Sequence, residues 1–251
     1  MDQILQKHRL KQVVLNRVRR IESNACQKSD YLFVCSEKEK AEFIDLYRVD
    51  KDKIVVVPNG SVSRDKVTDE RKIRSREKFA LAPNDDVVIF IGTYFKPNIQ
   101  ALDFIVKKIA PSCRRIKFLI VGSVADGFDR KQFPDNVIPL GRVPEEEMEE
   151  ALTAADMAVN PMFEGSGINI KMLDYMAFGL PIVTTEIGSR GIETASRRPF
   201  LISEAEAFSR NIKRVFDDKE LSRRMSDDAR SLIAGSYDWK NISAKAQDSP
   251  K

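Results

Sequence analysis

The sequence predicts an α/β protein built around a doubly wound parallel sheet, and two observations support this fold class. Short apolar runs alternate with segments of helical periodicity along most of the chain, which is the pattern of successive βαβ units. The chain has 251 residues, of which 42% are apolar, so it can bury one full core. We therefore expect one large sheet domain and a smaller segment before it.

The smaller segment is predicted to contain a helix, a strand and a second helix. Residues 4–27 carry a broad apolar stripe among Lys and Arg residues, and residues 31–35 form a short apolar run typical of a buried strand. Ser36 is a helix cap, and the helix that it starts ends near Tyr47. The single histidine, His8, has no glycine or acidic motif beside it, so we expect it on the surface rather than in catalysis.

The large domain is predicted from residue 61 onward, where strands and helices alternate. The pairs are 86–91 with 98–109, 116–122 with a loop, 136–139 with 144–154, 157–160 with 168–178, and 181–184, and a strand at 200–203 precedes further helices. Ligands of doubly wound sheets bind outside the carboxyl ends of the strands. The loops that follow these strands are therefore where a site is expected.

The segment FEGSGINIKMLDYMAFGLPIVTT combines a strand end, a glycine loop, a helix and a second strand. Gly165 and Gly167 permit a tight turn and a close approach of the backbone to a ligand. A helix that starts near Asn169 directs unpaired N–H groups at this loop, which favours an anion such as a phosphate. Lys171 and Asp174 are three residues apart and share one face of that helix.

Composition excludes several other classes of protein. Charged residues make up 32% of the chain with a net charge of +4 and are mixed along it, which favours solvated helix faces over nucleic-acid binding. The three cysteines form no CxxC pair or zinc pattern, so we expect reduced thiols and no metal. The basic start lacks the apolar core of a signal peptide. We expect a cytoplasmic protein, either free or peripheral to the inner face of the membrane.

The glycine segment closely resembles the donor-binding signature of the retaining GT-B glycosyltransferases of the group 1 family, also called family 4. Four further segments fit this family in order, namely IVVVPNGS, VVIFIGTYFKPNIQALDFI, FLIVGS and NVIPLGRVPEEEMEEALTAADMAVNP. The resemblance covers nearly the whole chain. It implies that residues 61–251 form a donor-binding GT-B domain for a UDP- or GDP-linked sugar, without cofactor or metal. Residues 1–60 then correspond to the remnant of an acceptor domain and a linker.

By this resemblance, two carboxylates are assigned to the donor. Glu164 matches the family's first acidic residue, which contacts the donor sugar or stabilises its developing charge, and it is the catalytic candidate. Asp174 takes the place of the second, usually a glutamate that binds the ribose hydroxyls. Nine residues separate the pair instead of the usual seven or so, and Asp is shorter than Glu. Lys171 resembles a lysine in a longer variant of this loop and can reach a diphosphate as a point charge.

For all three side chains the alternative is a solvated position on a loop or helix. Gly165, Ser166, Gly167 and Asn169 complete the donor-binding set in this segment.

A second anion site is predicted where Gly92 ends a strand and Asn98 opens the next helix. The family commonly places an Arg directly after this Gly and a Lys a few residues later. Here these positions hold Thr93 and Lys96, and a plain strand-to-helix loop is the alternative.

A third element is the segment LGRVP. There the resemblance implies that the main chain of Arg142 and Val143 binds the nucleobase.

The family also uses groups that this sequence does not show, namely an acceptor wall and a histidine near the transferred sugar. We therefore expect the donor-binding half of a retaining hexosyltransferase of polysaccharide biosynthesis, incomplete as a lone chain and completed by an acceptor domain in cis or in trans. The acceptor, a glycan or a lipid, is not identified. The alternatives are a non-catalytic nucleotide-sugar-binding or regulatory subunit and an interaction module that keeps only the fold. The apolar stripe of residues 4–27 predicts either self-association through this segment or a mobile amino-terminal helix.

Overall fold

The computed structural model describes the backbone of residues 2–165 and 167–247 and the side chains of residues 12–165 and 167–244. Ser166 and the side chain of His8 therefore lie outside what is described. The chain divides into two compact units, one formed by the residues before Asn59 together with those after Ala244, and the other by Asn59–Ala244. That residues 1–60 are the remnant of an acceptor domain and a linker stays a prediction.

The smaller unit has the predicted helix, strand and helix, followed by a second strand. Its elements are α1 (Asp2–Lys28), β1 (Leu32–Val34), α2 (Glu37–Tyr47), the 3₁₀ turn η1 (Lys51–Lys53) and β2 (Ile54–Val56). The two strands pair in parallel, with Leu32 opposite Ile54. Ser36 caps α2 as predicted, because its Oγ accepts the Glu39 N–H at 3.1 Å. Cys26 and Val34 belong to a small core of this unit.

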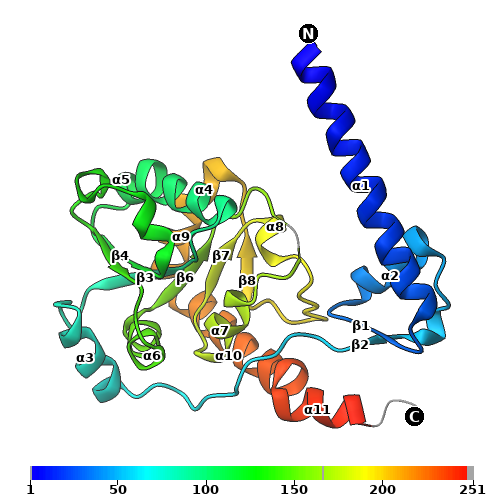
Figure 1. Cartoon of the computed structure of the whole chain (residues 1–251). Helices are drawn as coiled ribbons and strands as arrows, with labels where there is room; N and C mark the ends of the chain where they lie inside the picture. Colours follow the sequence, from blue (N-terminus) through cyan, green and yellow to red (C-terminus); the bar gives the residue numbers. More distant parts are fainter. Residues whose placement is uncertain (1, 166, 248–251) are drawn as a thin grey trace. The chain divides into compact units, whose positions relative to one another are not determined.

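The larger unit is a six-stranded sheet with helices on both faces (Figure 1). Its strands are β3 (Asp86–Ile91), β4 (Ile116–Val121), β5 (Val137–Gly141), β6 (Met157–Asn160), β7 (Ile182–Thr184) and β8 (Phe200–Ile202). Its longer helices are α3 (Asp69–Lys78), α4 (Lys96–Phe104), α6 (Glu145–Ala154), α7 (Lys171–Ala177), α9 (Phe208–Asp217) and α10 (Lys219–Leu232). Helix α11 (Trp239–Gln247) begins in this unit, and its residues after Ala244 are counted with the smaller unit. Shorter pieces are α5 (Ala110–Ser112), α8 (Glu186–Ser189), the π-helical turns η2 (Ile105–Ile109) and η6 (Ile233–Tyr237), and the 3₁₀ turns η3 (Ser123–Gly127), η4 (Arg130–Gln132) and η5 (Ala205–Ala207).

The strand order is β5-β4-β3-β6-β7-β8 and every pairing is parallel. This confirms the doubly wound parallel sheet. The order reverses direction between β3 and β6, and a crevice for ligands is expected outside the carboxyl ends of the strands at such a point. The strand order therefore predicts a ligand site at the loops after β3 and β6, and these are two of the loops that the sequence indicates.

Strand β3 shows why the sheet needs helices on both faces. Val87 and Ile89 pack in a core with α6, α7 and α10, whereas Val88 and Phe90 pack in a second core with α4 and α9. All four side chains are completely buried. Alternate residues of a strand point to opposite faces, so a central strand covered on both sides must be apolar throughout.

Two predicted helix starts are wrong. The helix after β3 begins at Lys96 rather than Asn98, and the helix after β6 begins at Lys171 rather than near Asn169. At the start of α7, the Met172 N–H donates to the Asn169 carbonyl at 2.9 Å, and the Leu173 N–H donates to the Ile170 carbonyl at 2.8 Å. These bonds span three residues instead of four, so the chain makes a tight turn before the α-helix can start.

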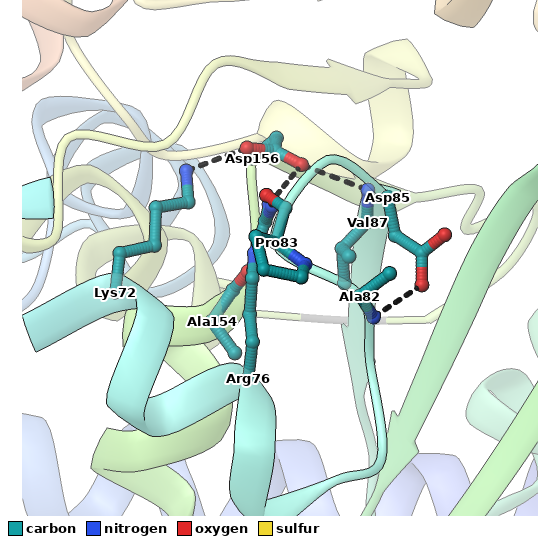
Figure 2. A network of polar contacts seen from close by, with 8 residues as sticks. All are labelled: Lys72, Arg76, Ala82, Pro83, Asp85, Val87, Ala154 and Asp156. Atoms are coloured by element: carbon teal, nitrogen blue, oxygen red, sulfur yellow. Dashed lines mark hydrogen bonds and ion pairs between the residues drawn. The ribbon is translucent and has the colours of Figure 1, made fainter. Parts of the chain in front are cut away.

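Helix α3 was not predicted, and charged side chains hold it to the amino edge of the sheet (Figure 2). Asp156, directly before β6, accepts hydrogen bonds from Lys72 Nζ at 2.5 Å, from Arg76 Nη2 at 2.7 Å and from the Val87 N–H at 2.8 Å. Arg76 is buried, and its Nε also donates to the Ala154 carbonyl at 3.1 Å. This buried cation therefore has a carboxylate partner and carbonyl acceptors, as a structural charge requires.

Candidate functional site

Gly92, Gly122 and Gly141 lie at the carboxyl ends of β3, β4 and β5 and take part in backbone hydrogen bonds between these ends. The Gly122 N–H donates to the Gly141 carbonyl at 2.6 Å, and the Gly92 N–H donates to the Val121 carbonyl at 2.9 Å. Gly122 has a φ of +98°, and a Cβ there would lie 2.3 Å from the Gly92 carbonyl oxygen. Only glycine fits at this crossing, so the backbone of the edge has no side chain over it at these positions.

The loop after β3 is organised by Asn98, which the sequence-based account treated only as a helix start. This side chain is buried, and its Nδ2 donates to the Thr93 carbonyl at 3.1 Å and to the Thr93 hydroxyl at 3.3 Å. Its Oδ1 in turn accepts a hydrogen bond from Lys171 Nζ at 2.8 Å. Thr93, Asn98 and Lys171 therefore form one chain of contacts across the switch point between β3 and β6.

Lys171 is not a solvated surface lysine. Its Nζ also lies 4.5 Å from the centre of the Phe90 ring, and burial lowers the pKa of the amine to about 7. Among the described side chains, no carboxylate forms an ion pair with it. An ammonium that is buried with only an amide oxygen and a ring face as partners lacks a neutralising charge, and a bound anion would supply one.

Glu164 links the loop after β6 to the loop after β3. Its Oε1 lies 3.0 Å from Lys96 Nζ, and this hydrogen-bonded pairing holds the pKa of Glu164 below its ordinary value. Both side chains are substantially exposed, so the pair is screened by water and contributes little to stability. Glu164 and Lys96, two predicted site residues from separate segments, are thus adjacent, and the Lys96 ammonium already has the Glu164 carboxylate as its partner.

The glycine loop itself has the backbone that the sequence predicts. Gly165 and Gly167 have φ values of +136° and +77°, which L side chains rarely adopt. The side chain of Asn169 has a partner within the protein, because its Nδ2 donates to the Ile187 carbonyl at 3.4 Å. Helix α7 has seven residues, so the anion site cannot be assigned to its amino terminus alone. Lys171 and the loop amides remain the candidate anion ligands here.

Asp174 faces a segment that the sequence-based site did not include. Its Oδ1 accepts a hydrogen bond from Ser61 Oγ at 3.0 Å. Burial raises the pKa of Asp174, while the Ser61 hydrogen bond and the charge of Arg64 act in the opposite direction. Ser61 ends the segment IVVVPNGS, so the signal was present in the sequence, although nothing in it showed which carboxylate the serine meets.

Next to Asp174, Tyr175 holds α7 against the sheet, because its hydroxyl oxygen accepts the Ile91 N–H at 2.7 Å.

The loop after β5 presents Arg142 and Val143. Arg142 Nε lies 3.4 Å from Asp126 Oδ2, with both side chains largely exposed, and Val143 packs on the core. The side chain of Arg142 therefore points along the surface, and the base contact of the main chain here stays a prediction.

Within the described residues, no group of three or more His, Cys, Asp or Glu side chains is placed to hold a metal ion. No helix in the described part of the chain is both long and apolar enough to cross a membrane.

An open parallel sheet with glycine loops at its carboxyl edge belongs to the doubly wound class that binds ligands at that edge. Comparison with family models is more specific. The model described as "Glycosyl transferases group 1" matches residues 85–218, more than half of the chain, and "Glycosyltransferase Family 4" matches residues 5–61. The chain therefore belongs to the group 1 glycosyl transferases.

Curated relatives match only part of their own length. An uncharacterised 44.6 kDa protein of the cps region of Klebsiella pneumoniae is 28% identical over 168 residues, which cover 62% of this chain and 43% of the relative. A D-inositol 3-phosphate glycosyltransferase of Nocardia farcinica is 28% identical over 196 residues, which cover 70% of this chain and 41% of the relative. The chain spans roughly two fifths of the length of these proteins.

Solved structures share the fold. HepE of Anabaena, crystallised with UDP and glucose, matches with a TM-score of 0.75 at 14% identity, covering 92% of this chain and 65% of HepE. The sucrose-phosphate synthase of Thermosynechococcus elongatus matches with a TM-score of 0.72 at 17% identity, covering 91% and 59%. At these identities the likeness establishes the architecture and not the substrate.

Proposed function

We propose that this chain binds the nucleotide-sugar donor of a retaining glycosyltransferase that transfers a hexosyl group. The observation that carries the proposal is the buried amine of Lys171, which sits at the switch point of the sheet without a carboxylate partner among the described side chains. A diphosphate brings the charge that this amine lacks. Family membership and the structural neighbour that binds UDP-glucose support a nucleoside diphosphate over other anions.

Each candidate residue has a task in this proposal. Lys171, the Thr93 hydroxyl and the amides around Gly167 hold the diphosphate and stabilise the charge that develops on it as the sugar leaves. Asp174 accepts the ribose hydroxyls, since a carboxylate with one oxygen on Ser61 keeps further lone pairs.

Glu164 faces the sugar. Its contact with Lys96 is exchanged for one with the donor when the sugar binds, and Lys96 is then free to reach the phosphate. The base lies against the main chain of Arg142 and Val143. Titration with UDP and GDP distinguishes uracil from guanine as this base.

Transfer needs more than the donor. Holding an acceptor hydroxyl beside the anomeric carbon is worth up to about 7 to 11 kcal/mol of the barrier, and the larger unit offers groups for the donor side of this reaction. We therefore assign acceptor binding to an acceptor domain, in cis or in trans, and expect at most slow donor hydrolysis by residues 1–251 alone. The acceptor in this proposal is a glycan or a lipid of polysaccharide assembly at the cytoplasmic side of a membrane, and the relative in a cps region supports the polysaccharide part of it.

The test is calorimetric titration of the 251-residue chain with UDP, GDP and ADP in the presence of EDTA. We expect one of the first two to bind without added metal, and Lys171→Met to weaken it by about tenfold or more, as for loss of a charged hydrogen bond. Lys108→Met, at an exposed lysine, is the matched control and should leave the affinity unchanged. Failure of all three nucleotides to bind would overturn the proposal and support an interaction module.

Binding without transfer would have a different meaning. If the nucleotide binds but no sugar is transferred after a matching acceptor domain is added, the chain is a non-catalytic binding subunit.

A further inference from the structure

An arginine that no sequence motif indicated holds the glycine loop. Arg190 follows α8, and its Nη2 donates to the Gly165 carbonyl at 2.8 Å and to the Gly167 carbonyl at 3.4 Å, while its Nε lies 3.4 Å from the same Gly167 oxygen. The two acceptors are backbone atoms on either side of the turn. One guanidinium thus gathers two carbonyls that would otherwise be free to rotate with the glycines that carry them.

This contact fixes the direction of the loop amides. In a trans peptide the C=O and the N–H point in opposite directions, so a carbonyl that turns toward Arg190 turns the N–H of the same peptide unit away from it. The peptide between Gly167 and Ile168 is held in this way, and the Ile168 N–H is directed to the side of the loop opposite Arg190. When the carbonyl groups of a backbone segment point to one side, its N–H groups point to the other, and N–H groups directed at one place can bind an anion.

The segment that carries Arg190 is itself anchored to the sheet. Asn160, the buried last residue of β6, donates from Nδ2 to the Gly188 carbonyl at 3.0 Å, and Thr185 Oγ1 accepts the Gly188 N–H at 3.0 Å. Gly191 has a φ of +79°, and a Cβ there would lie 2.5 Å from Ile168 Cγ1. The chain after α8 therefore touches the glycine loop through both the guanidinium and the Gly191 backbone. An element anchored to the sheet thus contacts the glycine loop.

We propose that Arg190 is a positioning residue of the donor site, which holds the Gly165 and Gly167 carbonyls so that the Ile168 amide faces the diphosphate. The inference rests on the proposed function, because it needs an anion at this loop. Arg190 acts through the backbone and does not bind the ligand itself, since Nε and Nη2, the donors with described partners, are directed at carbonyl oxygens. Its side chain is half-buried and its described hydrogen bonds reach the glycine loop, so its loss affects the loop more than the stability of the whole fold.

The test compares Arg190→Ala with Arg198→Ala, which removes the same charge from an exposed arginine of the same segment. Three measurements are made on each protein: the UDP dissociation constant, the melting temperature, and hydrogen exchange of the amides between residues 163 and 170 without ligand. We expect Arg190→Ala to bind UDP about tenfold more weakly, with faster exchange in the loop and a melting temperature close to that of the wild type. Arg190→Lys should recover part of the affinity, because an ammonium can reach one carbonyl but lacks the planar fork.

The outcomes separate the two proposals. If the wild type binds UDP and both alanine variants bind it equally, Arg190 has no role in positioning and the inference is wrong while the donor site stands. If Arg190→Ala weakens UDP binding but leaves loop exchange unchanged, Arg190 contacts the ligand directly and the inference is again wrong. If the wild type binds neither UDP nor GDP, the proposed function fails first and the role of Arg190 fails with it.

Discussion

Binding of a diphosphate to this protein should be accompanied by uptake of a proton on Lys171. The pKa of this amine is lowered by burial to about 7, compared with 10.5 for an exposed lysine. A diphosphate at hydrogen-bonding distance favours the charged form and raises the pKa again. Within the described part of the chain no charged group contributes to the pKa shift, since burial is its single cause, and the neighbours of the amine are the Asn98 amide and the Phe90 ring.

The size of the effect follows from these two values. At pH 8 an amine with a pKa of about 7 is protonated in about one molecule in ten, and one restored toward its ordinary value is almost fully protonated. Uptake should therefore approach about 0.9 proton per UDP at pH 8, about 0.5 at pH 7 and about 0.1 at pH 6. The dissociation constant should accordingly rise by up to about tenfold for each pH unit above 7, because each binding event must first charge the amine.

Calorimetric titrations at pH 8 in two buffers of different ionisation enthalpy measure this proton directly. At that pH the terminal phosphate of UDP is already ionised in both states, so it contributes little. Lys171→Met is the control if its residual binding is measurable, and Lys108→Met should behave as the wild type. Uptake below about 0.2 proton in the wild type at pH 8 would refute the reasoning, because the amine would then be charged before the ligand arrives or remain neutral after it.

Four further predictions concern other parts of the molecule. Asp156→Asn should lower the free energy of unfolding by about 3 kcal/mol in urea titrations, because it leaves the buried guanidinium of Arg76 without its anion, and an unchanged midpoint would contradict that role. Asp174→Ala should weaken UDP binding by about 1.5 to 3 kcal/mol, the range for hydrogen bonds to a charged group, and an unchanged dissociation constant would place this acid outside the site. Gly167→Glu should abolish UDP binding, since it adds bulk and negative charge at a φ of +77°, and equal affinity in this variant would remove the loop from the site. Self-association through α1, where Val14 is 55% exposed, should appear in sedimentation at high concentration and weaken in Val14→Glu, whereas a wild type that stays monomeric would contradict it.

The strands were predictable because the central ones are buried on both faces. The ranges 86–91 and 157–160 match β3 and β6 at both ends, since an apolar run covered by helices on two sides cannot extend into solvent. Helix α3 was missed for the opposite reason. Its sequence, DERKIRSREK, carries a single apolar residue, and the positions that it buries are Ser75 and Arg76. Ion pairs rather than an apolar stripe attach it to the sheet, so periodicity gives no signal.

The residues of the site were predictable as types, but their partners were not. Glycines after a strand and a lysine near a helix start are visible in the sequence, and the resemblance to the family adds roles for them. The contact between Asn98 and Lys171 joins residues that are 73 positions apart, and Arg190 bonds loop carbonyls that lie 23 and 25 positions before it. Such contacts follow from the order of strands in the sheet, which pattern alone does not specify.

Two buried cations in the larger unit illustrate how structural and functional charges differ. Arg76 meets a carboxylate and carbonyl oxygens at the amino edge of the sheet, and such a fully paired charge serves the fold. Lys171, at the carboxyl edge, has an amide oxygen and a ring face instead, and its lowered pKa measures the cost of keeping a charge there. Between pH 7 and 10.5 the unfolded chain holds a proton on this lysine that the folded chain has lost, so its contribution makes the fold less stable as the pH falls toward 7. A bound anion would remove the penalty of burying this ammonium without a carboxylate, which explains why the protein keeps a side chain that destabilises its free form. Lys171 also lies at the switch point between β3 and β6, where ligands of doubly wound sheets bind.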